Sequence, residues 1–272
     1  MNKKRILYIS QEIYPYSPKT TVSNISRYLP QAIQEKGKEI RSFMPKYGNI
    51  NERRNQLHEV IRLSGMNLII DDTDHSLIIK VASIQPARMQ IYFIDNDDFF
   101  QHRETIVDEN GLEYQDNDER SIFFTRGVME TVKKLRWIPD VIHCHGWFSA
   151  LVPLFIKKGY ADDPCFKDSK VVYSVYDDAF NNPFHEEIAK KLLFEGIDEA
   201  EIKSINERGT MDFENLTKMA IDYSDAVVQG SENINSNISK YITENDIDFI
   251  PFNADFDSNV DEIDALYNRL KA

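Results

Sequence analysis

Short apolar runs and segments of helical periodicity alternate along the first part of the chain. Residues 5–10, "RILYIS", form a continuous apolar run that is typical of a strand buried on both faces. Apolar residues then recur at helical spacing: Val22, Ile25, Leu29, Ala32 and Ile33. Gly37 fits as the stop of this helix, and residues 39–45 have the pattern of a second strand. This strand–helix–strand order predicts a parallel sheet with a right-handed crossover.

The segment from residue 57 to residue 95 has a different pattern. It holds four β-rich runs close together, "LHEVIRL", "MNLIIDD", "SLIIKVAS" and "RMQIYFID". Asp-Asp-Thr-Asp and Gln-Pro stand between them and are typical of turns. We therefore expect an antiparallel or mixed addition to the sheet.

The second half returns to alternation. The expected elements are a helix at 118–135, a strand at 140–145, a helix at 149–159, a strand at 170–176, helices at 184–195 and 212–223, a strand at 225–230, a helix at 231–242, a strand at 247–252 and an amphipathic helix at 258–271. The chain shows no repeat, no low-complexity tract and no Gly/Ser linker. The pattern predicts an α/β fold in which residues 1–272 form one Rossmann-like, doubly wound domain with a mostly parallel sheet.

Composition and charge narrow the range of partners. The chain has 272 residues, of which 42% are hydrophobic, and a formal net charge of −13. An acidic chain repels phosphate backbones and anionic lipid, so nucleic acid and membrane surfaces are not expected as partners. Two cysteines are too few for a disulfide scaffold, and the apolar run near the N-terminus is too short for a signal peptide. We expect a cytoplasmic protein, with neutral sugars or small metabolites open as ligands.

Ligands of parallel sheets bind beyond the carboxyl ends of the strands, and two histidines lie at one such end. His143 and His145 share a side because strand residues alternate. Two such ligands are weak support for zinc, and no metal is expected. His145, just past the strand end, is placed to reach a bound molecule, so His145→Ala is expected to leave thermal stability nearly unchanged. His143 is interpreted as a core histidine, and Trp147 as a wedge between the next helix and the sheet.

The loop after the first strand, "QEIYPYSPKTTVSN", is a poor phosphate cradle. It holds no glycine, Pro18 has no N–H to offer, and Thr20 and Thr21 are β-branched. Lys19 is open to two interpretations, a contact to an anion or a solvated surface lysine.

Acidic residues elsewhere have structural interpretations. Asp116 or Asn117 fits as the N-cap of the helix at 118–135, with Arg120 near its first turn. The pairs 71–72 and 177–178 are adjacent aspartates whose side chains diverge in a strand, and we expect them to be solvated. Spacing alone assembles no Ser-His-Asp or Cys-His arrangement.

Several motifs together resemble one family. They are, in chain order, "ILYISQEIYPY", "LPQAIQEKGKEIRSFMPKYGNI", "DFFQHR", "YQDNDERSIFFTRGVMETV", "PDVIHCHGWFSALVPLFIK" and "NLTKMAIDYSDAVVQGS". The sequence is similar to the N-terminal domain of bacterial glycogen synthases and plant starch synthases, the retaining ADP-glucose-dependent enzymes of glycosyltransferase family 5.

The resemblance implies one half of a GT-B fold, in which two Rossmann-like domains enclose the active site. The family's N-terminal domain carries the glucan acceptor, and its C-terminal domain binds most of the ADP-glucose, a donor substrate and no cofactor. We expect this chain to hold the acceptor-side domain alone, because residues 246–272 do not have the pattern of a second βαβ array.

The family's functional motifs are altered here. Where the family loop has Lys, Gly-Gly and Asp, this chain has Pro18, Thr20-Thr21 and Asn24, with Lys19 one position away from the family's lysine. These residues make a degenerate donor-phosphate loop. His-x-His-Asp-Trp-His becomes "HCHGWF", and Thr-Ile-His-Asn becomes "SVYD".

The resemblance assigns roles to the residues that persist. His145 corresponds to the histidine beside the transferred glucose and Asp116 to an acceptor-side aspartate, so both are the catalytic candidates. The predicted cleft wall is formed by His143, Trp147, Tyr176 and Asp177.

Two hypotheses follow from these alterations. The first is a glycogen-synthase-like protein that is inactive alone and binds α-glucan or regulates glycogen metabolism. The second is a glucosyltransferase completed by a separate donor-domain chain or by self-association. An interaction module that has lost its ligand is a third possibility. Losing one preorganised donor costs about 10²–10³ in rate, and the altered loop removes several, so the resemblance implies negligible transfer by this chain alone.

Overall fold

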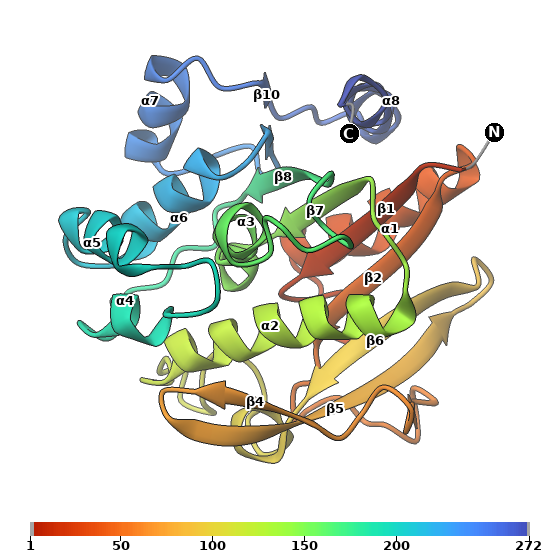
Figure 1. Cartoon of the computed structure of the whole chain (residues 1–272). Coiled ribbons are helices and arrows are strands. Elements are labelled where there is room, and N and C mark those ends of the chain that lie inside the picture. Colours follow the sequence, from red (N-terminus) through yellow and green to blue (C-terminus); the bar gives the residue numbers. More distant parts are fainter. Residues whose placement is uncertain (1–2, 271–272) are drawn as a thin grey trace.

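A computed structural model describes residues 3–270 and shows a central sheet between two layers of helices (Figure 1). The described residues form one ten-stranded sheet of order β10-β9-β8-β7-β1-β2-β6-β5-β3, with β4 paired to β5. Its strands are β1 (Arg5–Ser10), β2 (Glu39–Pro45), β3 (His58–Glu59), β4 (Met66–Ile70), β5 (Thr73–Ile84), β6 (Met89–Asp95), β7 (Val141–His145), β8 (Lys170–Val175), β9 (Ala226–Gln229) and β10 (Phe249–Ile250). The predicted α/β class and mostly parallel sheet are confirmed.

The parallel part of the sheet has a switch of direction at its centre. From β1 the chain passes through α1 (Thr21–Glu35) to β2 on one side, while β7 pairs with β1 on the other side. All pairs from β10 to β6 along this order are parallel. In a doubly wound sheet, this switch point opens a crevice beyond the carboxyl ends of the two central strands. The crevice here lies beyond β1 and β7.

The β-rich middle segment forms the antiparallel addition that the sequence predicts. The long strand β5 pairs antiparallel with β3, β4 and β6. Asp71 and Asp72 connect β4 to β5 with positive φ values of 45° and 64°. A two-residue hairpin turn of this kind requires left-handed backbone at both positions, which aspartate tolerates better than most residues.

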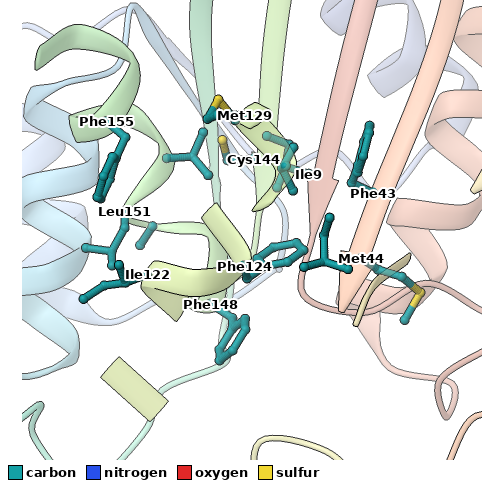
Figure 2. Close-up of a cluster of buried hydrophobic side chains, with 14 of the residues drawn as sticks. Ile9, Phe43, Met44, Ile122, Phe124, Met129, Cys144, Phe148, Leu151 and Phe155 are labelled. Atoms are coloured by element: carbon teal, nitrogen blue, oxygen red, sulfur yellow. The ribbon is translucent and has the colours of Figure 1, made fainter. Parts of the chain in front are cut away.

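Two hydrophobic clusters cover the two faces of the sheet. On one face lie α2 (Asn117–Leu135), α6 (Phe213–Asp222) and the irregular segment after β7. Side chains of β1, β2 and β7, such as Ile9, Phe43 and Cys144, meet Phe124 of α2 and Phe148 there (Figure 2). On the other face, α1 and α8 (Phe256–Arg269) cover a smaller cluster that includes Tyr8 and Tyr267. The alternation of strand side chains therefore sends His143 and His145 to the α1/α8 face, opposite Cys144.

The helix predicted at 184–195 is wrong in extent. The chain forms only the short α4 (Ile188–Lys191), and α5 (Glu199–Glu207), which the sequence pattern missed, follows it. A tight turn then follows α4, in which Phe194 and Ile197 form an isolated bridge. Gly196 lies in this turn with φ +87°, and a Cβ there would stand 2.4 Å from the carbonyl oxygen of Lys158. Asp198 then starts α5 by accepting bonds from two backbone N–H groups.

The segment predicted as a helix at 149–159 is irregular. It consists of the 3₁₀ turn η2 (Trp147–Ser149), the short α3 (Val152–Leu154) and the π-helical turn η3 (Phe155–Gly159). Pro153 lacks the N–H that a regular helix needs at this point.

Most other predicted elements are confirmed, some in shortened form: the helix predicted at 231–242 begins only at Ser236 as α7 (Ser236–Glu244), and the runs at 57–63 and 247–252 yield the two-residue strands β3 and β10. The π-helical turn η1 (Asp97–Gln101) follows β6. Residue 271, the predicted end of the last helix, lies outside the described residues. No helix within residues 3–270 is long and apolar enough to cross a bilayer.

Candidate functional site at the switch point of the sheet

A close approach between two loops closes the floor of the crevice. Gly146, directly after β7, has φ +83°, and a Cβ there would lie 2.4 Å from the Gln11 side chain. The Gln11 amide N–H donates to the carbonyl oxygen of His145 over 3.1 Å. Its side-chain Oε1 accepts from the Phe148 N–H over 3.2 Å. Gly146, which stands where the family has aspartate, therefore allows the loop after β1 to pack directly on the loop after β7.

His143 is a fully paired core histidine, as predicted. It is completely buried, and its ring nitrogens bond the hydroxyls of Tyr267 over 2.5 Å and Ser174 over 2.7 Å. Tyr267 in turn bonds the Tyr8 hydroxyl over 2.9 Å. Burial, together with the neighbouring His145, lowers the pKa of His143 well below its usual value. This ladder ties β1, β7, β8 and α8 together.

His145 is also completely buried, which contradicts the expectation that its side chain reaches a molecule bound to this chain. Its Nδ1 bonds the Tyr176 hydroxyl over 2.6 Å, and the Tyr176 ring covers Gly230, where a Cβ would lie 2.2 Å from the ring. Nε2 has no hydrogen-bond partner among the described residues. Burial lowers the pKa of His145 to about 3, so the ring is neutral at neutral pH.

Asp178 corrects the expectation that the aspartate pair 177–178 is solvated. Asp177 is exposed, but Asp178 is half-buried and accepts a bond of 2.9 Å from the Trp147 N–H. Burial raises the pKa of Asp178 to about 7, and the nearby Glu12 adds to the shift. Glu12 itself has a raised pKa because it is desolvated. Two carboxyl groups therefore lie at the edge of the crevice, and the binding of an anion next to them is disfavoured.

The predicted donor-phosphate loop is organised as a helix cap. Thr20 is the N-cap of α1: its Oγ1 accepts from the Ser23 N–H over 3.0 Å, and the Thr20 N–H donates to Ser23 Oγ over 2.8 Å. The Thr20 hydroxyl also donates to the Glu12 carboxylate. Lys19 and Thr21 are exposed, and Lys19 fits its interpretation as a surface lysine. The N-terminus of α1 thus uses its own side chains where an anion would otherwise bind.

Asp116 occupies the N-cap position of α2 but does not cap it. Its side chain makes no bond to the helix and pairs instead with the Arg103 guanidinium. Arg120, expected near the first turn, lies fully inside the protein. It donates to the carbonyl oxygens of Phe99 and Thr105, each over 2.8 Å, and to Asn117 Oδ1 over 2.6 Å. No spacing pattern along the chain signals this buried arginine.

A cavity of about 530 Å³ opens beside Trp147, and the motif analysis missed most of its wall. The wall includes aromatic rings and amide or carboxyl groups: Tyr114, Trp147, Phe180, Phe184, His185, Glu113, Gln115, Asn117 and Asn182. Trp147 packs edge-on against Phe148 and lies 4.7 Å from Phe180 between ring centroids. Trp147 therefore packs as predicted and also borders a cavity. The "FNNPF" stretch that follows β8 was the available signal, because it places two aromatic rings around amides at a strand end.

The structure thus gathers some of the predicted residues and separates others. His143, His145, Trp147, Tyr176 and Asp177 all lie at the ends of β7 and β8. Thr20 joins them through Glu12, whereas Asp116 is held by Arg103 at the start of α2. Within residues 3–270, no three His, Cys, Asp or Glu side chains form a group that could hold a metal ion.

A doubly wound sheet, with a ligand crevice at its switch point and an aromatic cavity beside it, defines a Rossmann-like α/β domain. The family described as "Starch synthase catalytic domain", glycosyltransferase family 5, matches residues 5–248. The chain belongs to this family.

Individual relatives agree with this assignment. The chain is 36% identical to the glycogen synthase of Chlorobium limicola over 197 residues, which cover 72% of this chain and 40% of that protein. It is 34% identical to the glycogen synthase of Chlorobaculum parvum over 228 residues, 84% of this chain and 46% of that protein. The chain therefore spans less than half the length of these relatives.

A solved structure shares the fold. The catalytic domain of starch synthase IV from Arabidopsis thaliana, bound to ADP and acarbose, superimposes with a TM-score of 0.72 at 18% identity. The match covers 92% of this chain and 51% of that chain.

Proposed function

We propose that these 272 residues form a glycogen-synthase-like domain that binds α-glucan and does not transfer glucose by itself. The observation that carries the proposal is the closed N-terminus of α1. Thr20 and Ser23 bond each other's backbone N–H groups there, and Glu12 lies against the cap.

The closed cap disfavours the diphosphate of a sugar nucleotide. A helix N-terminus binds phosphate through free N–H groups and its positive dipole end. Here the Ser23 N–H already has a partner, and Pro18 supplies none. The carboxyl groups of Glu12 and Asp178 lie near this edge, and their raised pKa values show that negative charge is disfavoured there. Several interactions, each worth about 10²–10³ in rate, are therefore missing from donor binding and transfer.

The aromatic cavity supports the glucan part of the proposal. Sugar-sized ligands bind in pockets of roughly 300–1,000 Å³ that combine apolar walls with a few polar groups, and this cavity of about 530 Å³ has both. Its aromatic lining can contact the C–H groups of a sugar, and the side-chain amides of Gln115 and Asn182, which line the same cavity, can bond hydroxyls. The related plant domain was solved with acarbose, which fits a saccharide as ligand class. We further propose the cytoplasm as the compartment, because the two cysteines are free thiols.

The alternative is a glucosyltransferase completed by a separate donor-domain chain or by self-association. One observation favours it: Nε2 of His145 is buried without a partner at the carboxyl end of β7. An unpaired buried nitrogen of this kind is costly unless a further group completes the site.

Glycogen co-sedimentation tests the binding proposal. The wild-type chain is expected to pellet with glycogen, and Tyr114→Ala, which removes a ring from the cavity wall, is expected to weaken binding about tenfold. Tyr28→Ala is the matched control, because Tyr28 is 46% exposed on α1 and does not line the cavity. Wild-type protein that stays in the supernatant would contradict glucan binding and favour the interaction module.

A further inference from the structure

A basic pocket lies at the amino ends of the strands, at the opposite edge of the sheet from the crevice. It has a volume of about 330 Å³, and its lining includes Lys3, Gln34, Arg41, Arg88 and Gln90. Arg41 and Gln90 stand side by side, each one residue before the paired Ser42 and Ile91 of β2 and β6. The chain has a net charge of −13, so the local positive charge of this pocket is opposite in sign to that of the whole protein.

The neighbouring charges at this edge are already paired. Lys38, which also lines the pocket, bonds Asp264 over 2.7 Å, and Lys36 bonds Asp261 over 2.5 Å. The carboxylate of Glu39, the acidic side chain in the wall, lies 3.4 Å from Arg5 and accepts the Trp137 Nε1–H over 2.5 Å. In these ion pairs the opposite charges cancel. The net charge of the pocket is therefore set by its other cations, Lys3, Arg41 and Arg88.

Arg41 and Arg88 form no ion pair with any residue in the range 3–270. Aromatic rings hold the Arg41 guanidinium, whose Cζ lies 5.1 Å from the Trp137 ring centre and 5.7 Å from the Tyr92 ring centre. Its Nη1 is buried without a hydrogen-bond partner among the described residues. Stacking fixes the plane of the guanidinium, and its outer N–H groups, together with the exposed Arg88, are the donors that suit a phosphate.

The carbonyl groups at the end of α1 do not oppose this charge strongly. The N–H groups of Lys36, Gly37 and Lys38 bond the carbonyl oxygens of Ala32, Gln34 and Ile33. The negative end of the helix dipole is therefore partly satisfied. Since interactions in water fade beyond about 8–10 Å, the nearby arginines outweigh the distant acidic surface.

We propose that this pocket binds the phosphate group of a small metabolite. The volume lies at the small end of the range for ligand sites, which suits a single phosphorylated sugar and not a dinucleotide. Gln34 and Gln90 line the same space. Gln34 Nε2 donates to the carbonyl oxygen of Ala87 and Gln90 Oε1 accepts from the Tyr92 hydroxyl, so Gln34 Oε1 and Gln90 Nε2 are the atoms that can bond hydroxyl groups next to the phosphate. The site is separate from the glucan cavity and does not depend on the proposed function.

Isothermal titration calorimetry of the whole chain, in low-salt buffer without phosphate, tests the site. The probes are inorganic phosphate, glucose 6-phosphate and glucose. Saturable binding of the two phosphate probes and none of glucose is expected. Glucose 6-phosphate binding at least about tenfold tighter than inorganic phosphate assigns the site to an ester, and equal affinities assign it to free phosphate.

Variants identify the residues that bind the probe. Arg88→Gln and Arg41→Gln are each expected to raise the Kd about tenfold, because each removes a charged hydrogen-bond donor. Arg54→Gln makes the same change at an exposed position outside the pocket and is expected to leave the Kd unchanged. Arg88 is exposed, so Arg88→Gln is expected to keep the fold. It therefore tests the site even if Arg41→Gln, which loses the stacking on Trp137 and Tyr92, does not fold. Absence of binding by both phosphate probes, equal binding of glucose, an unchanged Kd in Arg88→Gln, or an equal loss in Arg54→Gln would overturn the proposal.

Discussion

His145 and Asp178 illustrate how burial decides the state of a residue at this crevice. His145 is the last residue of β7 and Asp178 follows β8, and the sequence predicts that both face solvent or a ligand. The structure encloses His145 completely and holds Asp178 half-buried against the Trp147 N–H. Each side chain is consequently biased toward its neutral form, with a pKa of about 3 for the histidine and about 7 for the aspartate.

His145→Ala is expected to lower the free energy of unfolding by about 2–4 kcal/mol, against the small effect that the sequence predicts. The substitution leaves a cavity and removes the partner of the Tyr176 hydroxyl, two established causes of large losses. Urea denaturation measures the change. His102→Ala, at an exposed position, is the control and is expected to stay within about 0.5 kcal/mol of wild type. Equal stability of His145→Ala and wild type would show that the ring is not a core residue.

Asp178→Asn is expected to stabilise the protein at alkaline pH and not at acid pH. Because the folded state raises the pKa of Asp178, it binds this proton more tightly than the unfolded state does. The resulting stabilisation is present at low pH and is lost as the pH rises through about 7. Asparagine never ionises and still accepts the Trp147 N–H bond, so a gain of about 1–2 kcal/mol is expected at about pH 8.5 and none at about pH 4.

Asp177→Asn is the matched control for this pH dependence, because its side chain is exposed. Thermal unfolding of both variants across this pH range checks the sign. A gain that is equal at both ends of the range, or equal in the two variants, would argue against a buried, proton-binding Asp178.

At the residue scale, the sequence predicts which side of the sheet a strand residue faces but not its partners. Strand alternation led to the interpretation of His143 as a core histidine, whereas the capping role of Thr20, interpreted as part of a degenerate phosphate loop, was missed. Arg120 depends on carbonyl groups at Phe99 and Thr105, which only tertiary folding brings to it. Asp178 likewise depends on a backbone N–H of Trp147, 31 positions earlier in the chain.

At the scale of elements, the turns that follow the central strands β1 and β7 form the walls of the crevice. The turn after β7 needs a glycine for two reasons, a positive φ and the contact with Gln11. The turn after β1 ends in the reciprocal cap of α1. Both features leave little freedom for the loops that line the site.

Gly146→Ala is expected to destabilise more than Gly37→Ala. Both positions have a positive φ, +83° and +92°, so both variants incur backbone strain of about 1–2 kcal/mol. Only Gly146 also meets another side chain, since a Cβ at Gly37 finds nothing within 4 Å. An additional loss of about 1–3 kcal/mol is therefore expected for Gly146→Ala in chemical denaturation. Equal losses would show that the loops do not pack as closely as the structure indicates.

Thr20→Ala is expected to cost about 1 kcal/mol, and Thr20→Gly only a few tenths, as for other helix N-caps. Thr21→Ala, one residue later and exposed, is the control with little expected effect. Denaturation midpoints at constant slope distinguish the three variants. A negligible loss in Thr20→Ala would contradict the capping role that closes this helix end.

Sequence patterns predicted regular elements better than interrupted ones. Periodicity found α1 and α8 because each buries one continuous apolar stripe. It failed at 184–195, where only Ile188–Lys191 are helical, and it missed the cap at Asp198 that starts α5. It also missed the π-helical turn η3, because the spacing of hydrophobic residues does not specify which backbone hydrogen bonds form.

At the scale of the whole molecule, the class of sheet follows from the alternation of elements, whereas the strand order and the cavity do not. The βαβ pattern predicts a doubly wound, mostly parallel sheet. The switch point between β1 and β7 is seen only in the structure. The aromatic cavity joins residues 112–117 with Trp147 and residues 180–185. Three separated loops meet there only because the sheet holds their ends at one edge.

The central claim is that this chain, by itself, lacks the means to hold a sugar nucleotide for transfer. The most direct measurement is the incorporation of radiolabelled glucose from ADP-glucose into glycogen by the purified chain. The account predicts no incorporation above the level without protein, together with retention on glycogen. Sustained incorporation that scales with the concentration of the purified chain would contradict it.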